Sequence, residues 1–287
     1  MCYVTGPFRL SGTDLFHWRR VAMLREFLIS LRTRCAPAFV RLGYRYAAVA
    51  CVGRAARCAA AWAPHQESTR RRILTAMAEA PAGCNTAVIL GAGPCLDLPM
   101  AELLSRFRRV LLVDIAHPPA ARELARRHAA IELLDYDLTG VAIALANGST
   151  QAPPTPSCTV CQDDGDVGLV VSANLISQLP LVPLRQVDKR WPSTDLPSYA
   201  RSIIRAHIDH LRGFDCPTLL IGDVQRRVID PDGRVTEMED PLFGADLPAG
   251  EMEWDWTVAP VGELSNGWSI INRVRAVRID RAYCVAS

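Results

Sequence analysis

Apolar residues recur at helical spacing through the first 80 residues of the chain. They predict a helix over 15–34, a second over 37–61 that Pro64 ends, and a third over 70–80. No run in this segment has the short, continuous apolar character of a buried strand. We therefore expect residues 1–82 to form a helical cap without strands.

The pattern changes beyond residue 83, where short apolar runs alternate with amphipathic segments. The runs predicted as strands are 86–90, 109–114, 131–137, 167–174 and 217–223. The segments predicted as helices are 98–107, 118–127 and 199–214. Stretches rich in Ser, Thr, Pro or Gly, 148–166 and 180–197, are predicted as loops. Such alternation is typical of a parallel sheet covered by helices.

The end of the chain follows a different pattern. Asp232-Gly233 predicts a hairpin turn within 227–235. Two further strand patterns, 253–258 and 269–279, follow with little helix between them. Residues 83–287 are thus expected to form one α/β domain whose parallel sheet ends in antiparallel strands.

A Gly-x-Gly turn joins the first predicted strand to the helix after it. Gly91 and Gly93 permit positive φ angles and the close approach of a ligand to the main chain. Unpaired N–H groups at the start of the following helix favour a polar or anionic ligand. A β-turn-α corner without a ligand is the alternative interpretation of this motif alone.

Polar residues close the strands that follow this turn. Asp114 ends the second strand, 21 residues after Gly93, where a carboxylate can accept hydrogen bonds from both ribose hydroxyls. Asp137 ends the third strand and could bind the amine of an adenine. Ser172 and Asn174 end the fourth. Because the carboxyl ends of parallel strands line one crevice, these residues together predict a ligand that carries adenosine.

With these residues, 84–287 resemble a class I S-adenosylmethionine-dependent methyltransferase. The resemblance is carried by segments at the ends of the first four strands: 88–93, 113–114, 135–138 and 170–175. It implies an α/β, Rossmann-like, seven-stranded and mostly parallel sheet of order 3-2-1-4-5-7-6, with S-adenosyl-L-methionine as the cofactor. The cofactor-binding residues that it implies are Gly91, Gly93, Asp114, Asp137, Leu138, Ser172 and Asn174.

The sequence departs from the family pattern at the glycine loop. No acidic residue stands two positions before Gly91, and Cys95 occupies the place of a frequent third glycine. Asp97 is a candidate to compensate. A flavin- or nicotinamide-dependent oxidoreductase is the main alternative, although Leu96 replaces the third glycine of that fingerprint. The other alternative is a non-catalytic protein that binds an adenosine ligand.

Methyl transfer needs positioning of the acceptor, and a general base only where the acceptor carries a proton. His65 lies between predicted cap helices, and Asn174 and Asp223 lie at strand ends, so these three are the candidate catalytic residues. His207 and His210 are interpreted as surface or packing residues. The cap and long loops favour a small-molecule acceptor, methylated on oxygen or nitrogen as in specialised metabolism. We expect no nucleic-acid partner, because basic and aromatic residues are not interleaved.

Charge and cysteine content limit the remaining choices. Net charge is +2, but residues 1–80 hold 13 arginines and four acidic residues, a local charge of +9. We expect this basic face to pack on the more acidic domain. Ten cysteines in apolar contexts and the lack of a signal peptide indicate a reducing, cytoplasmic location. The single Cys158-x-x-Cys161 pair does not predict a metal site, and no stretch is apolar enough for a transmembrane helix.

Overall fold

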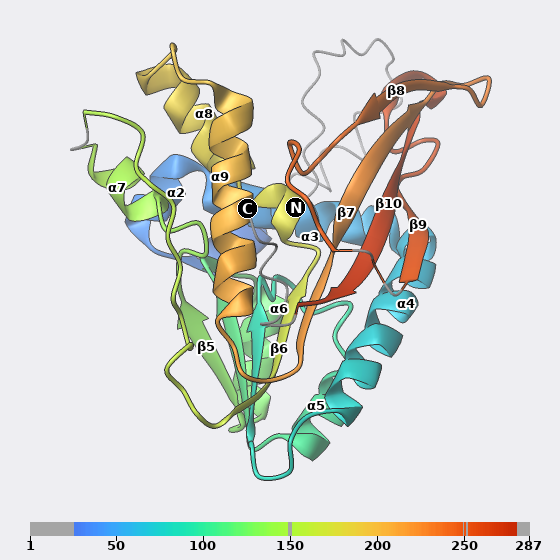
Figure 1. Ribbon diagram of the computed structural model, residues 1–287. Coiled ribbons are helices and arrows are strands. Elements are labelled where there is room, and N and C mark those ends of the chain that lie inside the picture. The colour runs from blue at the N-terminus through green and yellow to red at the C-terminus, as the bar shows by residue number, and fades with distance from the viewer. Residues whose placement is uncertain (1–25, 149–150, 249, 251, 280–287) are drawn as a thin grey trace.

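A mostly parallel β-sheet with helices on both faces forms the centre of the molecule (Figure 1). The computed structural model describes residues 26–148, 151–248, 250 and 252–279. In the N-terminal part the elements are β1 (Arg34–Cys35), α2 (Pro37–Leu42), α3 (Tyr44–Arg57) and α4 (Ala59–Ala78). Next come β2 (Thr86–Leu90), α5 (Met100–Arg106), β3 (Arg109–Asp114), β4 (Ala116–His117), α6 (Pro119–Arg127), β5 (Ile131–Asp135) and α7 (Ala142–Asn147). The C-terminal part contains β6 (Val167–Ala173), η1 (Ile176–Gln178), α8 (Leu181–Arg190), α9 (Leu196–Arg212), β7 (Thr218–Ile229), β8 (Val235–Glu239), β9 (Met252–Ala259), η2 (Ser265–Gly267) and β10 (Ser269–Arg278).

The strands of the large sheet lie in the order β5-β3-β2-β6-β7-β10-β9, and β8 pairs with β7. Pairing is parallel from β5 to β7 and antiparallel for β10 with both β7 and β9. The sheet of the described residues has eight strands and not the seven that the sequence resemblance implies, because β8 pairs with the second half of β7. Without β8, the path numbered along the chain is 3-2-1-4-5-7-6, which is the implied order. Chain order reverses between β2 and β6, so a crevice is expected above the carboxyl end of β2.

Alternate residues of each central strand enter different cores. Val88 and Leu90 of β2 face a cluster that contains residues of α2, α7, α8 and α9. Ala87 and Ile89 face the opposite cluster, to which α4, α5 and α6 contribute. This follows from the two-residue period of a strand. Because both faces are covered, the strand is apolar throughout, as the sequence pattern required.

The cap is not purely helical, which corrects the expectation from its apolar spacing. Residues 26–32 are helical, and the rest of the helix predicted from residue 15 lies outside the described residues. Arg34 and Cys35 form β1, which pairs antiparallel with β4 immediately after β3. A two-residue strand buries too little apolar surface to leave a period in the sequence.

The second and third cap helices also begin and end elsewhere than predicted. The chain breaks at Gly43, which takes a φ of 102°, and again at Cys58. Pro64, expected to end a helix, lies inside α4. Proline removes one backbone hydrogen bond from a helix, but tertiary packing can offset that loss. Here Trp62 and His65, on either side of Pro64, are both buried.

Salt bridges join the cap to the acidic domain, as its charge predicts. Arg34 pairs with Asp135 at the end of β5. Arg54 and Arg57 of α3 both reach Glu263, with nitrogen–oxygen distances of 3.3 and 2.8 Å. The arginines of the cap thus serve partly to fix it on the sheet domain. The division between cap and domain at residue 82 remains a prediction.

Two further segments differ from the sequence prediction. The stretch 180–197, predicted as a loop from its prolines, contains helix α8. Pro183 lies in the first turn of that helix, where proline is tolerated because the N–H it lacks would have no partner. Strand β7 continues to Ile229, well past the predicted end at residue 223, because β8 and β10 pair with its second half.

Candidate functional site

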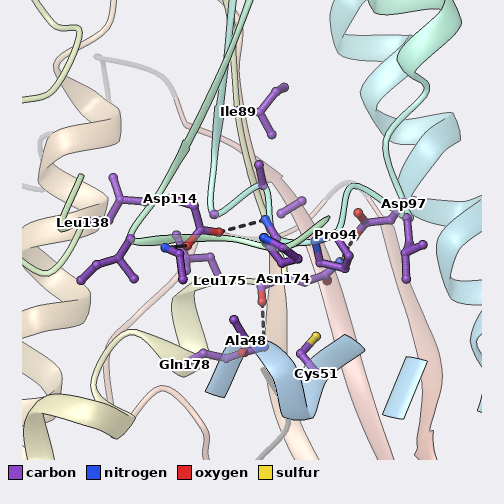
Figure 2. A pocket seen from close by; sticks show the side chains of 18 of the residues that line it. Ala48, Cys51, Ile89, Pro94, Asp97, Asp114, Leu138, Asn174, Leu175 and Gln178 are labelled. Atoms are coloured by element: carbon purple, nitrogen blue, oxygen red, sulfur yellow. Dashed lines mark hydrogen bonds between the residues drawn. The ribbon is translucent and has the colours of Figure 1, made fainter. Parts of the chain in front are cut away.

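A cavity lies at the carboxyl ends of β2, β3, β5 and β6, between the sheet and the cap (Figure 2). Its floor is the glycine turn. Gly91 has a φ of 75°, and a Cβ at this position would lie 2.9 Å from the side chain of Leu175. Gly93 has a φ of 50° and faces open space apart from the Gly91 carbonyl. Both glycines line the cavity, and Gly91 could not be replaced without strain.

The third glycine of the family pattern is absent, but the backbone conformation that it would supply is kept. Cys95 has a φ of 59°, in the left-handed region that residues with a side chain rarely adopt. Its thiol is buried, and this burial raises the pKa of the thiol well above its ordinary value. Cys95 therefore takes the place of a glycine in the turn as an unreactive core residue.

Asp114 closes β3 and holds the turn from the side. Its carboxylate accepts hydrogen bonds from the backbone N–H of Gly93 at 2.9 Å and of Ala116 at 3.2 Å (Figure 2). Burial raises the pKa of Asp114, and these backbone donors oppose the shift. The carboxylate lines the cavity and has lone pairs left for further donors, as its predicted role with ribose hydroxyls requires.

Asp137 and Leu138 follow β5, and both line the cavity. The Asp137 carboxylate accepts hydrogen bonds from the backbone N–H of Thr139 at 3.0 Å and of Ala142 at 2.6 Å. It therefore orders the loop into α7, a role that the sequence left open beside ligand binding. Leu138 is buried and lines the cavity. Contact of either residue with a ligand remains a prediction.

Asn174 is the most informative polar residue of the site. It has a φ of 57°, and its Nδ2 donates to the Asp97 carboxylate at 2.6 Å (Figure 2). Its main-chain oxygen accepts from the Gln178 side chain at 2.8 Å, so the residue is held at both ends. Its Oδ1 is buried without a hydrogen-bond partner among the described residues. A buried acceptor of this kind is unfavourable unless a ligand donates to it.

Asp97 is the hydrogen-bond partner of Asn174. The sequence alone marks it only as a candidate to compensate for a missing acidic residue. Burial raises the pKa of its carboxyl, while the hydrogen bond from Asn174 and the charge of Arg70 oppose that shift. Asp97 and Asn174 thus present a carboxylate and an amide oxygen to the same part of the cavity. Both are acceptors, which suits a ligand group rich in donors, such as an ammonium.

His65 lies on the cap side of the cavity and is 2% exposed. Its ring stacks on Trp256, with centroids 4.0 Å apart, and its Nδ1 accepts a hydrogen bond from the indole N–H of Trp254 at 3.0 Å. Burial lowers the pKa of His65 to about 3. His65 thus lines the cavity from within α4, and not from between two helices as the sequence predicted, and its low pKa makes it a poor general base.

Two predicted site residues lie outside the cavity. Ser172 is buried beneath the other face of β6, where its hydroxyl bonds His207 Nε2 at 2.8 Å. Ala173 and Asn174 line the cavity instead. Ser172 and Asn174 would share one face of a regular strand, but β6 ends at Ala173 and Asn174 has a φ of 57°, so its side chain leaves that face. Asp223 is 2% exposed, accepts from the Ser177 hydroxyl at 2.9 Å and does not line the cavity. Neither position supports the predicted contact with a cofactor or acceptor.

The cap supplies cavity residues that the sequence interpretation missed. Tyr44, Ala48 and Cys51 come from one face of α3, and Trp62 and Gln66 join His65 on α4. Their spacings of three and four residues are those of a single helix face. Once the cavity is known, that periodicity identifies them, whereas apolar spacing alone does not distinguish a cavity wall from a packed core.

The ionisable groups of the cavity have one sign. Its lining includes three carboxylates, Asp97, Asp114 and Asp137, and no arginine or lysine among the described residues. A low-dielectric cavity with this lining favours a cationic or hydrogen-bond-donating ligand and disfavours a diphosphate. In the described part of the chain, no group of three or more His, Cys, Asp or Glu residues could hold a metal ion. None of its helices is both long and apolar enough to cross a bilayer.

Solved structures of methyltransferases are similar to this chain. They include the N-methyltransferase NodS of Bradyrhizobium japonicum in complex with S-adenosyl-L-homocysteine, at 12% identity over 74% of this chain and 85% of that one, with a TM-score of 0.34. The 1,6-didemethyltoxoflavin-N1-methyltransferase of Burkholderia thailandensis shares 13% identity over 83% and 90%, with a TM-score of 0.32. The 23S rRNA methyltransferase ErmE shares 14% over 72% and 67%, with a TM-score of 0.28. No protein-family model matches the sequence, and no curated protein matches it significantly. Because these similarities are distant, the function has to be inferred from the residues of the site.

Proposed function

We propose that this protein is an S-adenosylmethionine-dependent methyltransferase that acts on a small molecule. The observation that carries the proposal is the single sign of the cavity lining, three carboxylates without a lysine or arginine among the described residues, next to the unpaired Asn174 Oδ1. S-adenosylmethionine bears an ammonium, a sulfonium, a ribose diol and an adenine amine beside a single carboxylate, so its net charge is positive and it offers cations and donors to these acceptors.

Each acceptor has a part of the cofactor to hold. Asp114, already oriented by Gly93 and Ala116, would accept from the ribose hydroxyls. Asp97 and Asn174 Oδ1 would accept from the ammonium. Asp137, beside Leu138, would accept from the adenine amine. Gly91 leaves the room that a side chain would fill. The bound cofactor supplies a methyl group on a positively charged sulfur.

The residues of the chain contribute positioning and exclusion of water. The cap helices α3 and α4 cover the cavity and place apolar and aromatic side chains over it. Asp223 does not line the cavity, and His65 has its Nδ1 occupied and a pKa of about 3. Neither is suited to remove a proton from the acceptor. We therefore propose that catalysis relies on orientation and desolvation of the acceptor.

A nucleotide-dependent oxidoreductase is less compatible with the site. Its cofactors carry a diphosphate, which binds at helix N-termini and cationic side chains. Here Asp97 stands four residues after Gly93 and lines the cavity, and the helix α5 begins only at Met100. The carboxylate would repel the diphosphate at the position where that fingerprint provides N–H groups.

Calorimetry on the purified protein tests the proposal. We expect binding of S-adenosylmethionine and S-adenosylhomocysteine and none of NADH or FAD. Asp114→Asn should weaken binding of S-adenosylhomocysteine at least tenfold, because a charge-assisted hydrogen bond to the ribose becomes a neutral one. Asp209→Asn is the control, since Asp209 is exposed and pairs only with Arg212 in the structure described. Binding of NADH or FAD in place of S-adenosylmethionine and S-adenosylhomocysteine would refute the proposal.

Turnover separates a methyltransferase from a protein that only binds an adenosine ligand. A panel of hydroxylated and amine-bearing aromatic compounds, assayed for release of S-adenosylhomocysteine, should contain compounds that are methylated. A protein that binds S-adenosylmethionine tightly but transfers its methyl group to none of a broad panel would support the non-catalytic alternative.

A further inference from the structure

The hydrogen bonds of His65 determine which ring nitrogen carries its proton. An indole N–H can only donate, so the bond from Trp254 requires Nδ1 of His65 to be unprotonated. The pKa of about 3 keeps the ring neutral near pH 7. A neutral imidazole with a bare Nδ1 carries its proton on Nε2. His65 is therefore a hydrogen-bond donor at Nε2 and has no free acceptor.

No acceptor for this proton exists among the described residues, where the only hydrogen bond of His65 is the one at Nδ1. The indole N–H of Trp256, whose ring stacks on His65, is buried and has no hydrogen-bond partner in the described structure. Both residues line the cavity and are less than 5% exposed. Two donors without acceptors on one cavity wall indicate that the occupant brings the acceptor atom.

The same wall is aromatic and rigid. Trp62 packs edge-on against Trp256, with centroids 5.0 Å apart and ring planes at 77°. The Trp62 N–H donates to the Val258 carbonyl at 3.1 Å, which fixes its ring. Aromatic side chains that are locked in this way favour the flat, apolar faces of an aromatic ligand. The carboxylates of the cavity disfavour an anionic one.

We propose that His65 binds the methyl acceptor through its Nε2–H, and that this acceptor is an uncharged aromatic molecule with a carbonyl oxygen or ring nitrogen at its edge. This inference rests on the methyltransferase function proposed above. His65 then orients the acceptor by donation, in contrast to the general base that its position in the sequence suggested.

Quinoline and naphthalene are matched probes for this site, because they share a shape and only quinoline has a ring nitrogen. With the protein saturated with S-adenosylhomocysteine, we expect quinoline to bind about tenfold tighter than naphthalene, the factor of one ordinary hydrogen bond. Quinoline-4-carboxylate should bind at least tenfold more weakly than quinoline. His65→Phe keeps an aromatic ring but no donor, so it should abolish the preference for quinoline over naphthalene while S-adenosylhomocysteine still binds.

A second measurement does not depend on a variant that folds. Nitrogen-15 NMR of the histidine-labelled protein, with the ring signals of His65 assigned through their contact with the Trp254 indole, should place the proton of His65 on Nε2 and find no protonation of that ring between pH 5.5 and 8. Equal affinity for quinoline and naphthalene, a preference for the carboxylate, or a proton on Nδ1 of His65 would each overturn the inference. Failure to bind S-adenosylhomocysteine at all would instead overturn the proposed methyltransferase function.

Discussion

The buried histidine His207 should make the stability of the protein depend on pH in a way that can be isolated by one substitution. His207 lies in α9 and is fully buried, and its Nε2 bonds the hydroxyl of Ser172 on β6 at 2.8 Å. Burial, and next the proximity of His210, lower the pKa of His207 from 6.5 to about 3. In the unfolded chain the ring has an ordinary pKa, so the unfolded state binds a proton at mildly acidic pH and the folded state does not.

This difference in proton binding sets the sign and the size of the pH dependence of stability. The contribution of His207 to stability is complete above pH 6.5 and is lost as the pH falls from there toward 3. Between pH 7 and pH 5 the loss amounts to about 2 kcal/mol, because each unit below the unfolded pKa corresponds to about 1.4 kcal/mol. His207→Gln removes the titrating ring, so its free energy of unfolding should fall by about 2 kcal/mol less than that of the wild type over this interval.

Urea unfolding at pH 7 and pH 5 measures this quantity, provided that the transition is two-state. Carboxylates that titrate in the same range are present in both proteins and cancel in the comparison. His128→Gln is the matched control, because His128 is exposed, and it should keep the pH dependence of the wild type. An identical loss of stability in wild type and His207→Gln would refute the assignment of His207 as a buried neutral ring.

Substitutions at four positions test the turn and the core. Cys95 has a φ of 59°, so Cys95→Gly should be about 1 kcal/mol more stable than Cys95→Ala, as thermal unfolding of the two variants would show. In a helix the order of glycine and alanine is the reverse. Gly91→Ala should weaken binding of S-adenosylhomocysteine at least tenfold in calorimetry, since the new methyl group would collide with Leu175. Leu211→Ala should destabilise the protein by about 3 kcal/mol in urea unfolding, because Leu211 is fully buried, whereas Leu96→Ala, at a position 39% exposed, should change stability by less than about 1 kcal/mol.

The sheet was predictable from sequence because its strands are buried on both faces. Continuous apolar runs such as 86–90 and 109–114 have no other simple explanation next to Gly-x-Gly and a terminal acid. The helical segments were harder to delimit. Pro64 lies inside α4 between two buried residues, and Pro183 lies in the first turn of α8, where no helical hydrogen bond is lost, so neither proline ends its helix.

The hydrophobic pattern could not show which of the predicted site residues face the cavity. Ser172 bonds a core histidine, whereas Asn174, two positions later and beyond the end of β6, has a φ of 57° and lines the cavity. The role of His65 depends on Trp254, 189 positions further along the chain. Spacing within the sequence cannot reveal a partner at that distance, so it could place His65 near the acceptor but not fix its tautomer.

The short pairing of β1 with β4 couples the cap to the cofactor side of the cavity. Arg34 and Cys35 pair with His117 and Ala116, and the Ala116 N–H donates to the Asp114 carboxylate. A molecule that engages Asp114 therefore tightens a hydrogen-bonded unit whose other edge belongs to the cap. The backbone amides of β1 should accordingly exchange with deuterium more slowly when S-adenosylhomocysteine is bound, although they need not touch it.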